Sequence, residues 1–221
     1  MLTALRNYTA KTQQTRSRVA RGDTLIEVLF AVAVMSLVIV TSITLMNQGT
    51  NTSVRSLQST LARQELDNQA ETLRFLNSAY VAAYTSGTPV SSGSATPAQV
   101  YRSILDAVEA KGAKSVTTFG TNNGTSCSKA PTGSFILNTK TARFQSYDAN
   151  KLVLATSYPQ IVYKDDGTLS QSQGVWIEAV RSAASGGTRY TDFHIRACWG
   201  APGMSVPMNL GTIVRLYDPA N

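Results

Sequence analysis

An uncharged apolar run near the amino terminus constrains the fold of this 221-residue chain more than any other feature. From Val28 to Met46 the sequence contains no charged residue, and about 20 apolar residues are enough to cross a bilayer as a helix. No second run of this kind follows in the sequence. The sequence therefore predicts one transmembrane segment at about residues 25–46, and the remaining length suffices for one further domain.

Positive charge is concentrated before this run. The formal net charge is +7, and five basic residues with no acid among them lie before Asp23, which leaves +2 for the rest of the chain: Arg6, Lys11, Arg16, Arg18 and Arg21. A basic flank predicts a cytoplasmic amino terminus, with the domain after the span on the other side of the membrane. The charge of that domain does not indicate a nucleic-acid partner.

Glu27 lies at the start of the apolar run, where a carboxylate in hydrocarbon costs about 2.5–3.5 kcal/mol on insertion scales. A secretory signal peptide would need a small-x-small cleavage site near the end of the span, and SITLMNQGTNTS offers no convincing one. A plain signal anchor explains the span and its orientation but gives Glu27 no role. In that case the Glu27 side chain simply extends to the cytoplasmic interface.

The stretch GDTLIEVLFAVAVMSLVIV (residues 22–40) resembles the prepilin amino terminus shared by type IV pilins and pseudopilins. That signature is a basic leader ending in glycine, a new terminal residue, Thr-Leu-Ile-Glu and a long apolar helix. The resemblance implies that residues 1–22 are a cytoplasmic leader, that a prepilin peptidase cuts after Gly22, and that it methylates the new terminal amine of Asp23. The family most often has phenylalanine where this chain has Asp23, and many pilins have a shorter leader.

The resemblance also gives Glu27 a role in assembly. In a filament of parallel helices, the Glu27 carboxylate would pair with the terminal amine of Asp23 on a neighbouring subunit. Pairing offsets the cost of burying either charge, and it fixes the axial register because a mispaired subunit leaves two uncompensated charges. Asp23 places a second carboxylate beside that amine.

Helical periodicity continues beyond the apolar run and predicts one long helix from about Thr24 to about Ala83. We therefore expect residues 23–84 to form a single helical segment, with Gly49 as its likeliest bend. Its second half is amphipathic, with one stripe facing a head domain at residues 85–221: Val54, Leu57, Leu61, Leu66, Leu73, Leu76, Tyr80 and Tyr84. After a Gly/Ser/Thr/Pro loop, Thr96 and Gln99 predict a capped helix from Pro97 to Lys111 that buries Ile104, Leu105 and Val108.

The remainder predicts strands at 134–138, 142–148, 151–158, 160–164, 174–182, 189–199 and 211–218, with turns at 165–170 and 183–188. Alternation places one set of side chains on the core face and leaves His194, Arg196 and Cys198 on an opposite, solvated face. The core set is Val175, Ile177, Ala179, Phe193, Ile195 and Ala197. We expect an α+β fold in which the long helix packs on a mostly antiparallel, pilin-like sheet.

The sequence offers little chemistry. His194 is the only histidine, and its neighbours do not form a catalytic or metal-binding arrangement, so we expect no enzyme activity, cofactor or metal. Asp165 and Asp166 are typical of a turn rather than of a calcium site. Cys127 and Cys198 predict a disulfide if this half is exported, or two small buried apolar side chains if it stays in the cytosol.

The leading interpretation is a major or minor pilin of a type IV pilus-like filament, anchored as a single-pass membrane protein and exposed at the cell surface after assembly. Its expected partners are prepilin peptidase, other pilin subunits and, before assembly, membrane lipid. Nucleic acid is not indicated, because the head's candidate contacts are scattered: Arg181, Arg189, Arg196 and Arg215. The alternatives are a pseudopilin of a competence or secretion machine, and a signal-anchored exported enzyme or binding domain.

Overall fold

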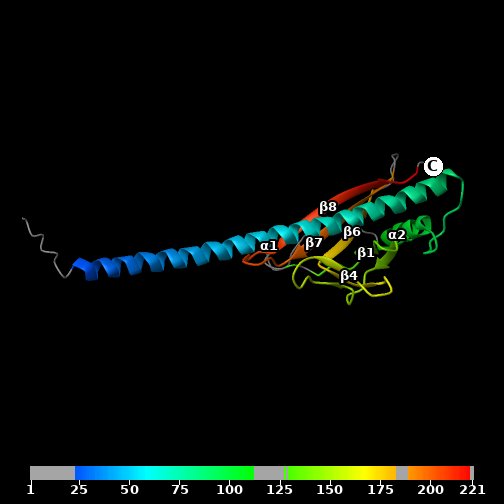
Figure 1. The fold of residues 1–221 in the computed structure, drawn as a ribbon. Helices are drawn as coiled ribbons and strands as arrows, with labels where there is room; N and C mark the ends of the chain where they lie inside the picture. Colours follow the sequence, from blue (N-terminus) through cyan, green and yellow to red (C-terminus); the bar gives the residue numbers. More distant parts are fainter. Residues whose placement is uncertain (1–22, 112–126, 128, 183–188, 220–221) are drawn as a thin grey trace, which may run out of the picture. The chain divides into compact units, whose positions relative to one another are not determined.

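The computed structural model of the protein describes residues 23–111, 127, 129–182 and 189–219. Within these residues the chain forms two helices followed by strands: α1 (Asp23–Thr85), α2 (Pro97–Lys111), β1 (Phe135–Asn138), β2 (Arg143–Ser146), β3 (Leu152–Val153), β4 (Gln160–Tyr163), β5 (Leu169–Gln173), β6 (Val175–Arg181), β7 (Tyr190–Trp199) and β8 (Met208–Tyr217) (Figure 1). The chain divides into two compact units, Met1–Gly49 and Thr50–Asn221, and α1 contributes to both. The predicted α+β layout, with a long amino-terminal helix and mostly antiparallel strands, is confirmed.

Helix α1 runs without proline from Asp23 to Thr85 and passes through Gly49 as helix. It ends where Gly87 adopts a left-handed φ of 72°. Gly87 N donates to Tyr84 O at 3.0 Å and Thr88 N donates to Ala83 O at 3.0 Å, so two of the last carbonyl groups find partners. Glycine has no Cβ penalty in this conformation, which explains why the helix stops here.

The second half of α1 buries one face in the core of the second unit. The buried apolar residues recur at three- and four-residue steps: Ala62, Leu66, Ala70, Leu73, Leu76 and Tyr80. The predicted stripe is confirmed at Leu66, Leu73, Leu76 and Tyr80, but it is wrong at Val54, Leu57 and Tyr84, which are exposed. Alanines and two glutamines, Gln58 and Gln69, complete the buried face, and an apolar pattern alone does not identify them.

Helix α2 has the predicted bounds and the predicted cap. Gln99 N donates to Thr96 Oγ1, and Thr96 N donates to Gln99 Oε1, each at 3.3 Å. This reciprocal pair satisfies two amide groups at the start of the helix. Ile104, Leu105 and Val108 are buried, as the helical spacing predicts.

The larger sheet is antiparallel throughout, in the order β2-β1-β6-β7-β8. In its centre Val175 pairs with Ala197, Ile177 with Ile195 and Ala179 with Phe193. All six side chains are buried, so the predicted core face is confirmed. Strand β8 begins three residues earlier than predicted, at Met208.

A second sheet, in the order β3-β5-β4, contradicts the expectation of a single sheet. Strand β5 begins inside the turn predicted at residues 165–170, because the actual turn is confined to the residues around Gly167. Strand β3 pairs with β5 in parallel. The β5 sequence LSQSQ buries only Leu169 and Ser172, so its apolar content is too low to indicate a strand. The predicted strand at 151–158 is reduced to Leu152–Val153.

Gly174 joins the two sheets, because β5 ends immediately before it and β6 begins immediately after it. Its N donates to Val153 O at 2.7 Å in one sheet, and its O accepts from Cys198 N at 2.9 Å in the other. The φ of Gly174 is +69°, and an added Cβ would lie 2.5 Å from Cys198 O. Only glycine fits both the backbone conformation and the space.

The face opposite the core was predicted to be solvated, and this is wrong near Cys198. Trp176, Glu178 and Cys198 are all buried there. Trp176 Nε1 donates to Glu178 Oε1 at 3.0 Å, and Arg196 Nε lies 3.4 Å from the same oxygen. The buried carboxylate is therefore paired, as buried charges generally are.

Candidate functional site

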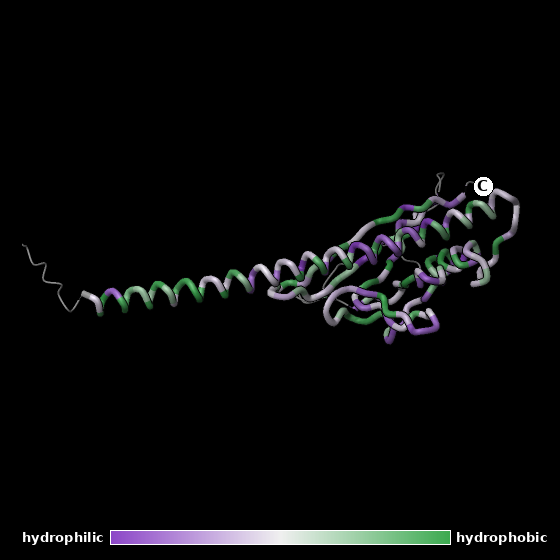
Figure 2. The backbone as a smooth tube through the Cα atoms, viewed as in Figure 1, coloured by the Kyte–Doolittle hydropathy of each residue, from purple (hydrophilic) through white to green (hydrophobic). Residues whose placement is uncertain are grey.

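Residues 24–49 of α1, here called the apolar segment, form the most unusual surface among the described residues. Its side chains are exposed within this chain, and hydrophobic residues prevail along it, as Figure 2 shows. One 18-residue window of α1 has a mean hydropathy of 2.6, so the helix is long and apolar enough to cross a membrane. The exposed large side chains are Leu25, Ile26, Val28, Leu29, Phe30, Val32, Val34, Met35, Leu37, Val38, Ile39, Val40, Ile43, Leu45 and Met46.

Hydroxyl groups in the middle of the apolar segment are satisfied inside the helix. Ser36 Oγ donates to Val32 O at 2.7 Å, Ser42 Oγ donates to Val38 O at 2.7 Å, and Thr44 Oγ1 donates to Val40 O at 2.9 Å. Thr41 Oγ1 lies within 3.0 Å of two preceding carbonyl oxygens. Such back-bonding removes the need for water, which hydrocarbon and packed protein do not supply.

Glu27 carries the only charge in the sequence between Thr24 and Gly49, and its side chain is exposed. It follows Asp23, the first residue of α1, by four positions, so its backbone lies about one turn, or about 6 Å, further along the axis. The positive end of the helix dipole also favours an acid in this first turn. Gly22 lies outside the described residues.

Cys127 and Cys198 form a disulfide, which was one of the two predicted alternatives. Their Cα atoms are 5.7 Å apart, and 71 positions of sequence separate them. Cys198 is fully buried in β7, whereas Cys127 is partly buried. The bond therefore fixes the chain at residue 127 to the larger sheet.

The surface around His194 is held by paired charges. Arg215 Nε and Nη2 donate to the two oxygens of Asp192 at 2.7 and 2.8 Å, and this pairing lowers the pKa of Asp192. Burial, and then Arg196, lower the pKa of His194. Over the described part of the chain, no three His, Cys, Asp or Glu side chains are placed to hold a metal ion.

Asp165 and Asp166 lie in the β4–β5 turn. Asp166 Oδ1 accepts from Thr168 N at 2.8 Å and from Thr168 Oγ1 at 2.6 Å, and these bonds lower the pKa of Asp166. The turn itself is closed by Lys164 N, which donates to Thr168 O at 2.8 Å. The Asp166 carboxylate thus takes part in local turn structure.

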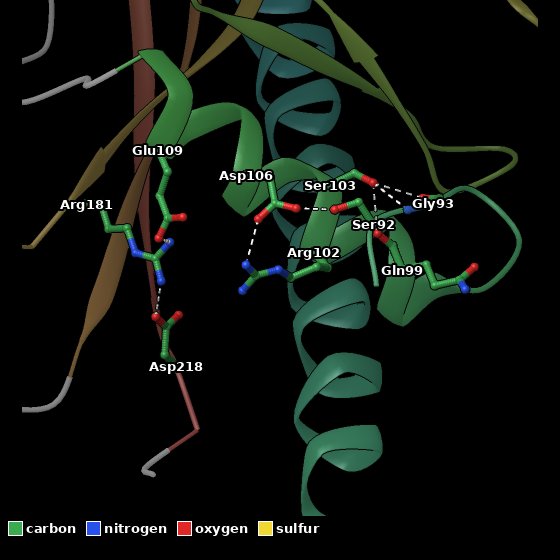
Figure 3. A network of polar contacts seen from close by, with 9 residues as sticks. All are labelled: Ser92, Gly93, Gln99, Arg102, Ser103, Asp106, Glu109, Arg181 and Asp218. Carbon is green, nitrogen blue, oxygen red and sulfur yellow. Dashed lines mark hydrogen bonds and ion pairs between the residues drawn. The ribbon is translucent and has the colours of Figure 1, made fainter. Parts of the chain in front are cut away.

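Sequence reasoning missed a polar network around α2. Figure 3 shows Arg181 between Glu109 of α2 and Asp218, with Nη2 2.5 Å from Asp218 Oδ2. One turn earlier in α2, Asp106 pairs with Arg102 at 2.9 Å and accepts from Ser92. Arg181 is largely buried rather than a surface contact, so its role is to join α2 to the end of β8.

The structure thus places the Asp23 backbone and Glu27 one turn apart at the start of the apolar segment, and the two cysteines in one bond. Comparisons of the chain with protein-family models, with curated proteins and with solved structures found no match.

Proposed function

We propose that the protein is a structural subunit, major or minor, of a type IV pilus-like filament. The observation that carries the proposal is the sequence GDTLIE at the start of a long helix whose first half exposes apolar side chains. The second half of that helix lies in an α+β unit with a disulfide, as expected for an exported head domain.

An exposed apolar segment of this length needs a partner, because contiguous apolar surfaces of this size are rare on soluble monomers. In the proposed pathway, lipid covers the segment before assembly, and the apolar segments of other subunits cover it in the filament. The basic residues before Asp23 keep the amino terminus in the cytoplasm, where a prepilin peptidase removes residues 1–22.

Cleavage after Gly22 would create an amine at Asp23, the first residue of α1. The Glu27 carboxylate of one subunit then pairs with this amine of the next subunit in a medium of low dielectric. Breaking a buried ion pair by removing one partner costs about 3–5 kcal/mol, which is enough to slow or prevent incorporation of a subunit. Glu27 therefore controls assembly rather than folding. A pseudopilin would share these features, because they belong to the common amino terminus.

The test replaces Glu27 with Gln, which has the same size but cannot neutralise an ammonium group. We expect Glu27→Gln to insert into the membrane, lose its leader and fold normally, but to be recovered in sheared or cross-linked filaments at about one-tenth of the parent level or less. Glu71→Gln is the matched control, because Glu71 is an exposed carboxylate elsewhere on α1.

Asp23→Phe tests whether the second carboxylate substitutes for Glu27. If Glu27→Gln assembles as well as the parent both alone and combined with Asp23→Phe, the pairing mechanism is wrong. A signal-anchored exported domain, the remaining alternative, would keep residues 1–22 in every variant.

A further inference from the structure

A cavity of about 480 Å³ lies among β2, the β1–β2 turn and the β4–β5 turn in the second unit. Among the described residues, its lining includes three cationic side chains, Arg143, Lys151 and Lys164, and no carboxylate. Phe144 and Leu169 supply apolar parts of the wall. The volume is in the range of cavities that hold small organic ligands.

The cations come from three separate segments but surround one space. Arg143 and Gln145 lie on the same face of β2, because side chains alternate along a strand. Lys151 Nζ donates to Gln145 Oε1 at 3.0 Å, which places its ammonium group at that face. None of the three cations forms an ion pair with a carboxylate of the described residues. Hydrogen bonds from Thr168 are the main cause that lowers the pKa of Asp166, and the charge of Lys164 adds a smaller effect.

The walls of the cavity are fastened to each other by a buried side chain. Asn138 is 6% exposed, and its Nδ2 donates to Gly167 O in the β4–β5 turn at 2.9 Å. Its Oδ1 accepts from Lys140 N at 3.0 Å and from Thr141 N at 3.2 Å in the β1–β2 turn. Asn138 also pairs in register with Arg143. The two turns are therefore held in place without a ligand.

We propose that this cavity binds a tetrahedral oxyanion, a sulfate or phosphate group, either free or carried on a sugar. Three like charges around one space repel one another, and a bound dianion converts that repulsion into charge-assisted hydrogen bonds. The guanidinium group of Arg143 suits bidentate contact with two of the oxygens. Leu169 leaves apolar wall for the organic part of a larger ligand. This inference is independent of the proposed filament.

The experiment measures binding of inorganic sulfate, inorganic phosphate and a sulfated disaccharide to the full chain in uncharged detergent by titration calorimetry. We expect saturable one-to-one binding that weakens about tenfold or more in each of Arg143→Gln, Lys151→Gln and Lys164→Gln. Lys129→Gln is the matched control, since Lys129 is exposed and does not line the cavity. Arg143→Lys keeps a positive charge at this position and should retain part of the affinity. Retained affinity would show that the loss in Arg143→Gln comes from the missing contact and not from unfolding.

Tighter binding of the disaccharide than of inorganic sulfate would identify a carbohydrate-borne group, and equal affinities would identify the free ion. Both results support the oxyanion site. Absence of saturable binding for all three ligands overturns it, and so does equal weakening in Lys129→Gln, because affinity would then follow bulk charge.

Discussion

Gln69 shows how a single residue fastens α1 to the larger sheet. It is fully buried, its Nε2 donates to Leu137 O at 2.8 Å, and its Oε1 accepts from Leu137 N at 3.0 Å. Strand β1 pairs with β6 only at Phe135, so the helix supplies hydrogen bonds to a strand that has separated from its neighbour. Gln58 acts similarly, because its Oε1 accepts from Trp199 Nε1 at 3.2 Å. Each bond satisfies a buried polar group that would otherwise destabilise the fold.

Glu65 makes the corresponding contact with the smaller sheet, where its Oε1 accepts from Ile161 N at 3.2 Å. Burial raises the pKa of Glu65 above its ordinary value of 4.5, despite hydrogen bonds from Asn68 and Ile161. Because its pKa is raised in the folded state, protonated Glu65 contributes to the free energy of unfolding. This contribution is fully present below pH 4.5 and is lost as the pH rises through the pKa of the folded state.

We therefore expect Glu65→Gln to raise the free energy of unfolding at pH 7 and to flatten its decline between about pH 4 and pH 7. Glutamine keeps an acceptor for Ile161 N but carries no desolvated charge. Urea unfolding across this pH range measures the effect. Glu71→Gln should change stability by less than about 0.5 kcal/mol, because its carboxylate is exposed. An equal response in both variants would show that burial of Glu65 is not the cause.

At the scale of elements, the sequence predicts those whose pattern is strong and local. Helix α2 is predicted with its bounds because Thr96, Pro97 and Gln99 form a capping signal. Strands β6 and β7 are predicted with their core face because apolar residues alternate over five positions in each strand, at 175–179 and 193–197. Strand β5 is missed because its backbone pairing, rather than its side chains, defines it. Likewise, Arg181 becomes a buried link only through distant residues, Glu109 and Asp218.

The disulfide connects residue 127 to β7, and closing a loop of this length restricts the unfolded chain. We expect the double variant Cys127→Ala/Cys198→Ala to lose about 2–5 kcal/mol of unfolding free energy. Urea unfolding of the full chain in detergent measures this loss, and reduction of the parent protein should reproduce it. Free thiols in the natively purified protein, or a loss below about 1 kcal/mol, would contradict a stabilising bond.

For the whole molecule, the proposal rests on two properties of one helix: an exposed apolar surface and a carboxylate, Glu27, at the start of that surface. The apolar segment exposes its side chains, whereas the later part of α1 buries one face in the second unit. A membrane span alone would explain the first property but would give Glu27 no partner. The proposed filament would account for both the exposed apolar surface and the carboxylate at its start.

The mass of the intact protein recovered from cells tests this account most directly. We predict a chain that begins at Asp23, with the added mass of one methyl group on its amine, and that retains the apolar segment. Replacing Gly22 with a bulky residue should block cleavage and leave the full chain in the membrane. A mass showing that residues 1–22 remain attached in assembled material would contradict the account, as would a chain that begins after Met46.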